Sequence, residues 1–367
     1  MGERRRSNVG RLPWLVGAIA VSLTVMSAGV ADAGPRPFGD ARILAQVPTP
    51  PGFPEGIAYT NNLVLVSGPA TFGTAGGPPS QVLMFSATNG LLLKAFPTKG
   101  ENLALEHANS SIALDRLNRV YVLNTQLGIY RLSLNGKQEQ YSTPFPDLKP
   151  CGTVPPGTPC SPTPFDAPPL PNDIVFDAAG NAYVTDSTQA TIWIVPPGGG
   201  QPQIWFQDIR LASTSIGVNG IRLNPARTKV FVTVTADLDG RAFVYTLPLV
   251  AHPSAAQLKV FHEYTNGDAP DGIAFGRSGR LYVTIATPFA SGVSILSPKG
   301  IEVARLANTT NPIYPYDSPA NAAFDGKGSM LLTNHAFATG GADPDQFTVL
   351  DVWVNDTGDP LEKPLII

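Results

Sequence analysis

The chain has 367 residues and a formal net charge of −3, and only 14% of its residues are charged. Beyond the amino-terminal segment there is no run of basic residues, so we exclude nucleic acid as a partner. The 36 glycines and 37 prolines favour many short strands joined by tight turns over long helices.

Residues 1–33 have the pattern of a signal peptide. Basic residues at 4–6 and 11 precede an apolar stretch at 15–26, and Ala31-Asp-Ala33 is a small-x-small cleavage site. We expect the mature chain, residues 34–367, to be one exported domain, secreted or periplasmic, with no membrane contact after cleavage. The alternative is an uncleaved membrane anchor, for which the apolar stretch is short.

A strand–turn–strand pattern recurs six times along the rest of the chain. In one copy, Asp271-Gly-Ile-Ala-Phe275 is followed by a tight turn and by Leu281-Tyr-Val-Thr284. We call the residue two before the isoleucine, or its equivalent, the key position. The six key positions are occupied by Glu55, Ser110, Asn172, Asn219, Asp271 and Ala320. Their mean spacing of 53 residues is typical of β-propeller blades.

The sequence therefore predicts an all-β fold: a six-bladed β-propeller with four-stranded antiparallel blades around a central channel. Each key position lies at the mouth of an innermost strand. Later strands of the blades are predicted at 63–66, 81–86 and 91–96; 120–123, 129–134 and 138–141; 182–185, 192–195 and 203–206; 230–234, 243–247 and 258–264; 281–285, 293–296 and 302–306; and 330–332 and 347–354. A strand at 41–47 is expected to complete the last blade.

A proline-rich insertion at 143–170 separates the second blade from the third. It is either a rim or lid loop beside the channel or a simple connection. It contains the only two cysteines, Cys151 and Cys160, which we expect to form a disulfide in an exported chain.

Four key positions carry side chains suited to a hard cation. The innermost strands of a propeller run in the same direction along the channel, so the key positions converge at one mouth. Glu55 and Asp271 supply two carboxylates, and Asn172 and Asn219 supply two amide oxygens, which suits Ca²⁺. The alternative is that these residues only favour the turns in which they lie.

The second strand of each blade returns to the same mouth. We therefore expect Asn124, Asp186 and His335, which end or follow such strands, to surround the site. Together with residues next to key positions, the predicted substrate rim is Asp173, Asn124, Asp186 and Asn321. His335 and His107 are candidate general bases.

These motifs resemble the senescence-marker-protein/gluconolactonase/luciferin-regenerating-enzyme family. The resemblance rests on Pro-Glu-Gly-Ile at 54–57, Asn-Asp-Ile at 172–174, Asn-Gly-Ile at 219–221 and Pro-Asp-Gly-Ile at 270–273. It implies a six-bladed propeller with a divalent metal, often calcium, in the channel. It also implies lactone hydrolysis, with Glu55, Asn172, Asn219 and Asp271 as metal ligands and Asp271 as base or nucleophile.

Two departures from the family pattern bear on the substrate. Leu170 stands where sugar-lactone members often carry an arginine, which favours a less polar substrate. Ser110 stands where the paraoxonases carry a histidine. We therefore predict a monomeric, metal-dependent hydrolase of a small lactone or related ester. The alternatives are a non-catalytic binding propeller with structural calcium, and a lyase or isomerase of a secondary pathway.

Overall fold

A computed structural model describes Gly2 and residues 36–265, 267–311 and 313–366. By its contacts the chain separates into residues 1–36 and 37–367, and the fold described below belongs to the second unit. The predicted signal peptide lies outside the described residues, apart from Gly2. Among the described residues, no helix has the length and apolar character needed to cross a membrane.

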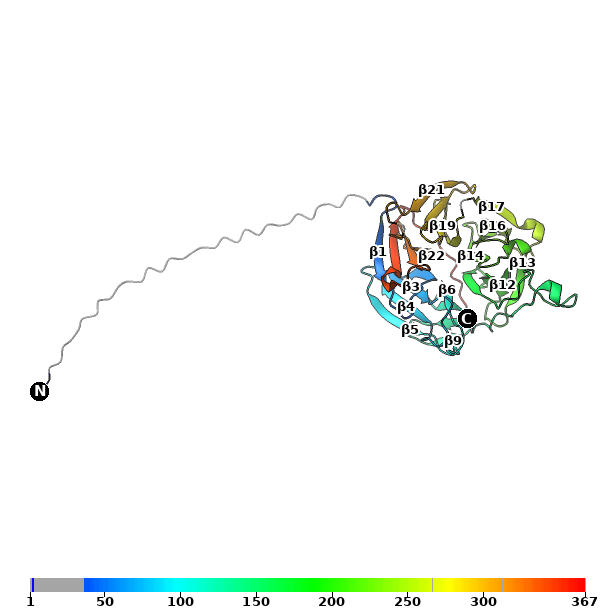
Figure 1. Ribbon diagram of the computed structural model, residues 1–367, viewed down its shortest axis with the longest axis horizontal. Helices are drawn as coiled ribbons and strands as arrows, with labels where there is room; N and C mark the ends of the chain where they lie inside the picture. The colour runs from blue at the N-terminus through cyan, green and yellow to red at the C-terminus, as the bar shows by residue number, and fades with distance from the viewer. Residues whose placement is uncertain (1, 3–35, 266, 312, 367) are drawn as a thin grey trace. The chain divides into compact units, whose positions relative to one another are not determined.

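Six four-stranded antiparallel sheets are arranged around a centre, as predicted (Figure 1). The first three blades, each given from its innermost strand outwards, are β2 Ile57–Thr60, β3 Leu63–Gly68, β4 Gln81–Ser86 and β5 Leu92–Pro97; β6 Asn109–Leu114, β7 Val120–Asn124, β8 Gly128–Leu132 and β9 Gln138–Gln140; and β10 Pro171–Phe176, β11 Ala182–Asp186, β12 Thr191–Val195 and β13 Gln203–Gln207.

The remaining blades are β14 Val218–Leu223, β15 Lys229–Val234, β16 Ala242–Pro248 and β17 Lys259–Tyr264; β18 Pro270–Phe275, β19 Leu281–Ile285, β20 Gly292–Leu296 and β21 Glu302–Ala307; and β22 Pro319–Phe324, β23 Ser329–Asn334, β24 Thr348–Trp353 and β1 Ala41–Gln46. Short 3-10 helices lie at Cys151–Thr153, Ile209–Leu211, Ala255–Gln257 and Pro344–Gln346.

The two ends of the domain meet in the last blade. Strand β1 pairs antiparallel with β24, with Ala41 opposite Val352 and Gln46 opposite Thr348. The innermost strands of neighbouring blades contact one another around the whole ring, including β2 against β22. The predicted closure of the last blade by the amino-terminal strand is confirmed.

Five of the six key positions lie inside the innermost strands rather than in front of them, and only Glu55 precedes its strand, β2. In five blades a β-bulge places two residues of the innermost strand opposite one residue of the second strand. In β10, for example, Asn172 and Asp173 together face Thr185, because Pro171 pairs with Asp186 and Ile174 pairs with Val184. Each bulge thus presents a key residue and the residue after it at the channel.

The residue opposite the bulge ties each blade to the next one. Its hydroxyl donates to the backbone carbonyl of the neighbouring blade's key residue at five of the six junctions, from Ser67 to Ser110, Thr185 to Asn219, Thr233 to Asp271, Thr284 to Ala320 and Thr333 to Glu55. At the sixth junction the corresponding residue is Leu123, and Ser110 Oγ instead donates to Pro171 O at 2.6 Å. The key residues are therefore held by their backbones.

Three of the key residues are followed by glycine because the neighbouring strand leaves no room for a side chain. A Cβ atom on Gly56 would lie 2.6 Å from the Cα of Ser111. A Cβ on Gly220 would lie 2.4 Å from Asp271 O, and one on Gly272 would lie 2.6 Å from Ala320 O. These close approaches explain the Glu-Gly, Asn-Gly and Asp-Gly pairs of the sequence.

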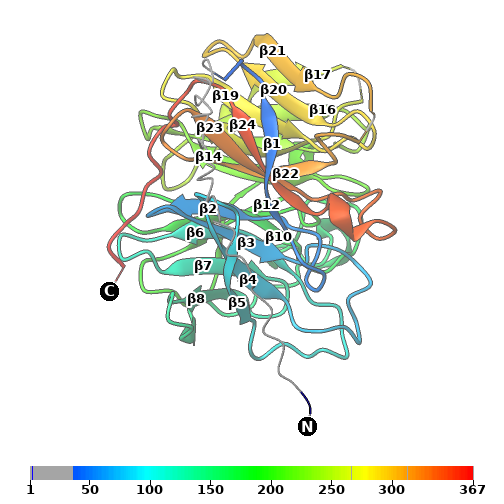
Figure 2. The ribbon, with the colours of Figure 1, turned by 90° about the vertical axis from the view of Figure 1, so that its left-hand side faces the viewer.

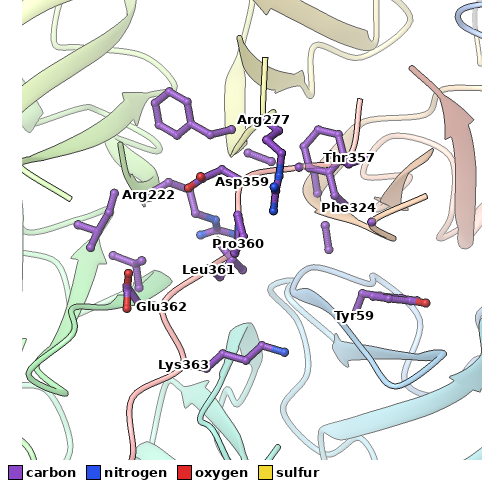
Figure 3. A pocket seen from close by; sticks show the side chains of 18 of the residues that line it. Tyr59, Arg222, Arg277, Phe324, Thr357, Asp359, Pro360, Leu361, Glu362 and Lys363 are labelled. Atoms are coloured by element: carbon purple, nitrogen blue, oxygen red, sulfur yellow. The ribbon is translucent and has the colours of Figure 1, made fainter. Parts of the chain in front are cut away.

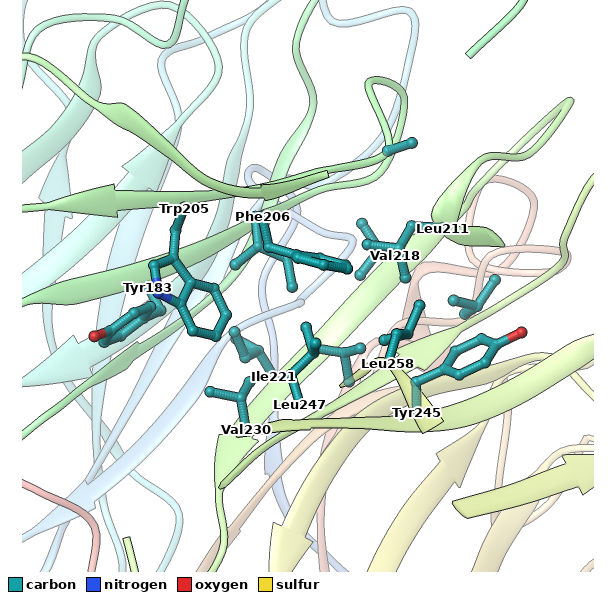
Figure 4. Close-up of a cluster of buried hydrophobic side chains, with 14 of the residues drawn as sticks. Tyr183, Trp205, Phe206, Leu211, Val218, Ile221, Val230, Tyr245, Leu247 and Leu258 are labelled. Atoms are coloured by element: carbon teal, nitrogen blue, oxygen red, sulfur yellow. The ribbon is translucent and has the colours of Figure 1, made fainter. Parts of the chain in front are cut away.

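The hydrophobic core is divided among the junctions between blades. One cluster, shown in Figure 4, packs Tyr183 and Trp205 of the third blade against Ile221, Val230 and Leu247 of the fourth. Alternate residues of the inner strands supply these contacts, as expected for sheets packed face to face. The ring is consequently one continuous body rather than six independent sheets.

The insertion at 143–170 is anchored to the third blade. Leu148 N donates to Gln189 Oε1, and Ser161 Oγ donates to Gln189 O at 2.8 Å. The predicted disulfide joins Cys151 to Cys160 within it. Because the insertion connects an outermost strand to the next innermost strand, it lies on the face where the key residues lie.

Replacing a bridging threonine should weaken the ring. In Thr333→Val the buried carbonyl of Glu55 loses its hydroxyl donor, and we expect the free energy of unfolding to fall by about 1–3 kcal/mol. Urea denaturation measures this difference. The matched control is Thr348→Val, since Thr348 Oγ1 is buried without a hydrogen-bond partner among the described residues, and this variant should be neutral or slightly more stable. Equal losses in both variants would contradict the role given to the bridge.

Candidate functional site

Two carboxylates of the key positions influence each other at the channel mouth. The side chain of Glu55 is buried, and burial raises its pKa well above the usual range, with the charges of Asp271 and Asp173 raising it further. Burial likewise raises the pKa of Asp271, as does the charge of Asp173, while a hydrogen bond from Asn219 lowers it. Ionising both groups is costly without a compensating positive charge.

Asn219 supplies an amide oxygen beside this pair. Its Nδ2 donates to Thr235 Oγ1 at 2.9 Å. Its Oδ1 is buried and accepts no hydrogen bond from any described residue. A buried acceptor without a donor is uncommon, and together with two carboxylates of raised pKa it fits a hard divalent cation.

The other key positions differ in the ligand atoms that they can supply to a cation. Asn172 lies in the corresponding bulge of β10 and is partly exposed. The hydroxyl of Ser110 is engaged with Pro171 O, and Ala320 has no polar side chain. Among the described residues no three His, Cys, Asp or Glu side chains cluster as a metal site. The predicted set of two carboxylates and two amides is of a different kind, and it stays a prediction.

His335 lies next to the carboxylate pair. Its Nε2 is 3.9 Å from Glu55 Oε2 and 2.8 Å from Ala70 O. Burial lowers the pKa of His335 to about 4, although the bond to Ala70 raises it. The imidazole is therefore neutral at neutral pH and forms no ion pair with Glu55. If Nε2 carries the proton donated to Ala70, Nδ1 has the free lone pair.

Two aromatic rings flank His335. Phe337 stacks on it with a ring-centroid distance of 6.0 Å, and Phe53 packs on it at 5.7 Å. The side chain of Phe337 is 59% exposed, and Phe72, in the loop that contains Ala70, is 70% exposed. Phe53 and Phe337 thus form an apolar shelf that extends from the histidine towards solvent.

The second candidate base, His107, has both ring nitrogens engaged. Nδ1 lies 2.9 Å from Leu105 O, and Nε2 lies 2.9 Å from Pro78 O. Burial lowers the pKa of His107, but the bonds to the two carbonyls outweigh burial and raise it overall. With both nitrogens facing carbonyl oxygens, His107 joins two loops and has no free lone pair.

Two predicted rim residues lie within the blades. Asn124 is fully buried, donates to Glu101 and Asn109, and accepts from the amides of Gln126 and Leu127. Asp186 is also fully buried, and it accepts from Leu170 N at 3.0 Å and from Trp193 Nε1 at 3.0 Å. Both side chains hold loops at the mouth in place.

The other two predicted rim residues form a polar layer below the key positions. Asp173 accepts from Arg222 Nη1 and from Ser111 Oγ, both at 2.6 Å. Arg222 Nη2 also donates to Asn321 Oδ1 at 3.1 Å, and both Asp173 and Arg222 are buried. Arg222 was not among the residues predicted from the sequence, although its place two residues after Gly220 in an innermost strand was a usable signal.

Comparisons with known proteins agree with this architecture. A calcium-binding protein, regucalcin, from Agrobacterium tumefaciens superposes with a TM-score of 0.61 at 15% identity, covering 90% of this chain and 98% of that chain. A luciferin-regenerating enzyme has a TM-score of 0.58 at 12% identity, with coverage of 89% and 100%. A gluconolactonase from Xanthomonas campestris has a TM-score of 0.53 at 14% identity, with coverage of 88% and 98%.

No family model and no curated protein matches the sequence. At these identities the similarity establishes the fold. The chain is a six-bladed β-propeller of the same architecture as the regucalcin, luciferin-regenerating-enzyme and gluconolactonase structures.

Proposed function

We propose that the protein is a metal-dependent hydrolase of a lactone or related ester, exported from the cytoplasm. The observation that carries this proposal is the pair of buried Glu55 and partly exposed Asp271, whose raised pKa values and neighbouring amide oxygen of Asn219 fit a divalent cation. The similarity to a calcium-binding protein and to a gluconolactonase supports calcium and a lactone in particular.

The proposed ligands are Glu55, Asn172, Asn219 and Asp271. Bound calcium would polarise a substrate carbonyl and stabilise negative charge on its oxygen. The backbone of each ligand is already fixed through the bridging hydroxyls, or at Asn172 through the Ser110–Pro171 bond, so little reorganisation is needed.

His335 is the proposed acceptor of the proton from the attacking water. Its Nδ1 stays unprotonated at neutral pH, because the pKa of His335 is lowered to about 4. Asp271 is the other candidate, and the two differ in a testable way. Loss of Asp271 should remove metal binding and turnover together, whereas loss of His335 should remove turnover alone.

The shelf of Phe53 and Phe337 indicates a substrate with an apolar or aromatic part. These rings offer no hydrogen bonds to sugar hydroxyls, and Leu170 adds none from its side chain. We therefore infer that an aryl ester or an alkyl-substituted lactone fits better than a sugar-acid lactone.

Turnover should depend on His335 and not on His107. Replacing a positioned general base by glutamine removes proton acceptance, so His335→Gln should lower kcat about 10²–10⁴-fold. His107→Gln should leave kcat within a few-fold and lower only the melting temperature. The measurement is hydrolysis of phenyl acetate and of γ- and δ-alkyl lactones with calcium present. A fully active His335→Gln variant would rule out this histidine as the base.

The same panel tests the function as a whole. Chelation should abolish hydrolysis and added calcium should restore it. A folded, calcium-loaded protein without activity towards any ester or lactone would instead favour a binding role or a lyase or isomerase activity.

Calcium should stabilise the fold in a pH-dependent way. Because Glu55 and Asp271 have raised pKa values in the metal-free protein, the folded state holds more protons than the unfolded state above about pH 4. Their contribution to the stability of the metal-free protein therefore falls as pH rises from 5 to 8. Calcium binds the deprotonated pair, so its effect should grow over the same interval, reaching about 5 °C in melting temperature near saturation.

Thermal unfolding with a chelator and with excess calcium measures both trends. In Asp271→Asn the calcium effect should be largely lost. Asp239 is exposed and is not at a key position, so Asp239→Asn should behave like the wild type. A calcium effect that is equal in both variants would show that the ion binds elsewhere.

A further inference from the structure

A cavity lies at the opposite end of the central channel from the key positions. It has a volume of about 840 Å³ and is lined by the far ends of the innermost strands, including Leu223, Phe275 and Phe324 (Figure 3). Asp271 is the second residue of β18 and Phe275 is its last, so most of the length of an innermost strand separates the two sites. Arg222 lines the cavity and donates a hydrogen bond to Asp173. This buried ion pair lies in the channel between the cavity and the key positions.

The carboxy-terminal segment forms one wall of this cavity. Residues 357–363 cross the face of the ring that lies away from the key positions (Figures 2 and 3). Asp359 N donates to Phe275 O, and Arg227 forms ion pairs with Asp359 and Glu362 at 2.5 and 2.7 Å. Arg116 N donates to Pro364 O. The wall is therefore fixed, and its two acidic residues are already neutralised.

Three other cationic side chains of the lining have no acidic partner of this kind. Lys363 is half-buried, and its Nζ reaches only the neutral Thr60 Oγ1, at 3.5 Å. The side chains of Arg277 and Arg116 have no hydrogen-bond or ion-pair partner within residues 36–265, 267–311 and 313–366. Burial lowers the pKa of Lys363, as expected for an amine that has lost water without gaining a carboxylate.

The remaining acid of the lining, Asp325, offsets only one of these three charges. Asp325 Oδ1 accepts from the amides of Lys327 and Ser329 and so stabilises the turn between β22 and β23. The lining thus carries five cationic and three acidic side chains, two of the acids being paired with Arg227. This excess of positive charge occurs in a chain whose net charge is −3.

We propose that this cavity binds a small organic anion, with a carboxylate or phosphate on Lys363 and Arg277 and an apolar body against Leu361 and Phe324. Figure 3 shows the Arg277 and Lys363 side chains directed into the open space beside the terminal segment. The volume suits a small molecule, and the aromatic and aliphatic lining suits an apolar body. The proposal does not depend on hydrolase activity at the other end of the channel.

Binding of benzoate, with benzamide as its neutral counterpart of the same shape, tests the proposal by titration calorimetry on the full chain. Benzoate should bind and benzamide should bind at least ten-fold more weakly. Lys363→Met and Arg277→Gln should each weaken benzoate binding about ten-fold. Lys327→Met, which removes an exposed charge near the cavity without altering its lining, should change nothing.

Equal affinity for benzoate and benzamide would overturn the proposal, as would equal losses in the Lys363→Met and Lys327→Met variants. Comparing phenyl phosphate with inorganic phosphate separates the contribution of the anionic group from that of the apolar part. The proposal requires phenyl phosphate to bind more tightly than phosphate.

A second measurement uses the wild-type chain and so does not depend on a variant folding. Benzoate should slow reductive methylation of Lys363 by formaldehyde, followed by peptide mass spectrometry, while methylation of Lys327 proceeds at its original rate. Unchanged methylation of Lys363 at a benzoate concentration that saturates calorimetric binding would place the anion elsewhere.

Discussion

One hydrogen bond recurs around the ring and sets both the fold and the candidate site. A hydroxyl on the second strand of one blade donates to the carbonyl of the key residue in the next, for example from Thr233 to Asp271. The bulge that presents the key residue would otherwise leave this carbonyl unpaired in a buried place. The same bond therefore satisfies the bulge, joins neighbouring blades and fixes the backbone of a proposed ligand.

Charge is distributed along the channel in layers. Glu55 and Asp271 lie at the mouth, Asp173 and Arg222 form a buried ion pair below them, and the far cavity has an excess of cations. The Arg222 guanidinium balances one carboxylate, which leaves the upper pair to be balanced by something else. A buried ion pair of this kind is costly to break, because removing Arg222 would leave Asp173 unpaired. The layered arrangement keeps two candidate sites of opposite charge apart in one channel.

Much of the fold, and part of the candidate site, was predictable from the sequence. The six-fold pattern gave the blades, the position of the first strand and the residues at the mouth, and the two cysteines gave the disulfide. The local pattern does not reveal which side chains a bulge buries, so Asp173 and Asn321 were expected at a rim and lie in a buried layer. His107 and His335 look alike in sequence, and only their neighbouring carbonyls, which come from distant loops, distinguish them. The repeated threonines of the second strands were a visible signal for the bridges.

The pairing of β1 with β24 has a consequence for how the chain comes to be folded. Strand β1 is made first, and its partner is made last, about 300 residues later, so bringing them together costs about 5 kcal/mol of chain entropy. Until then β1 presents an unpaired edge that other chains could join. Closure of the ring therefore waits for the final stretch of synthesis.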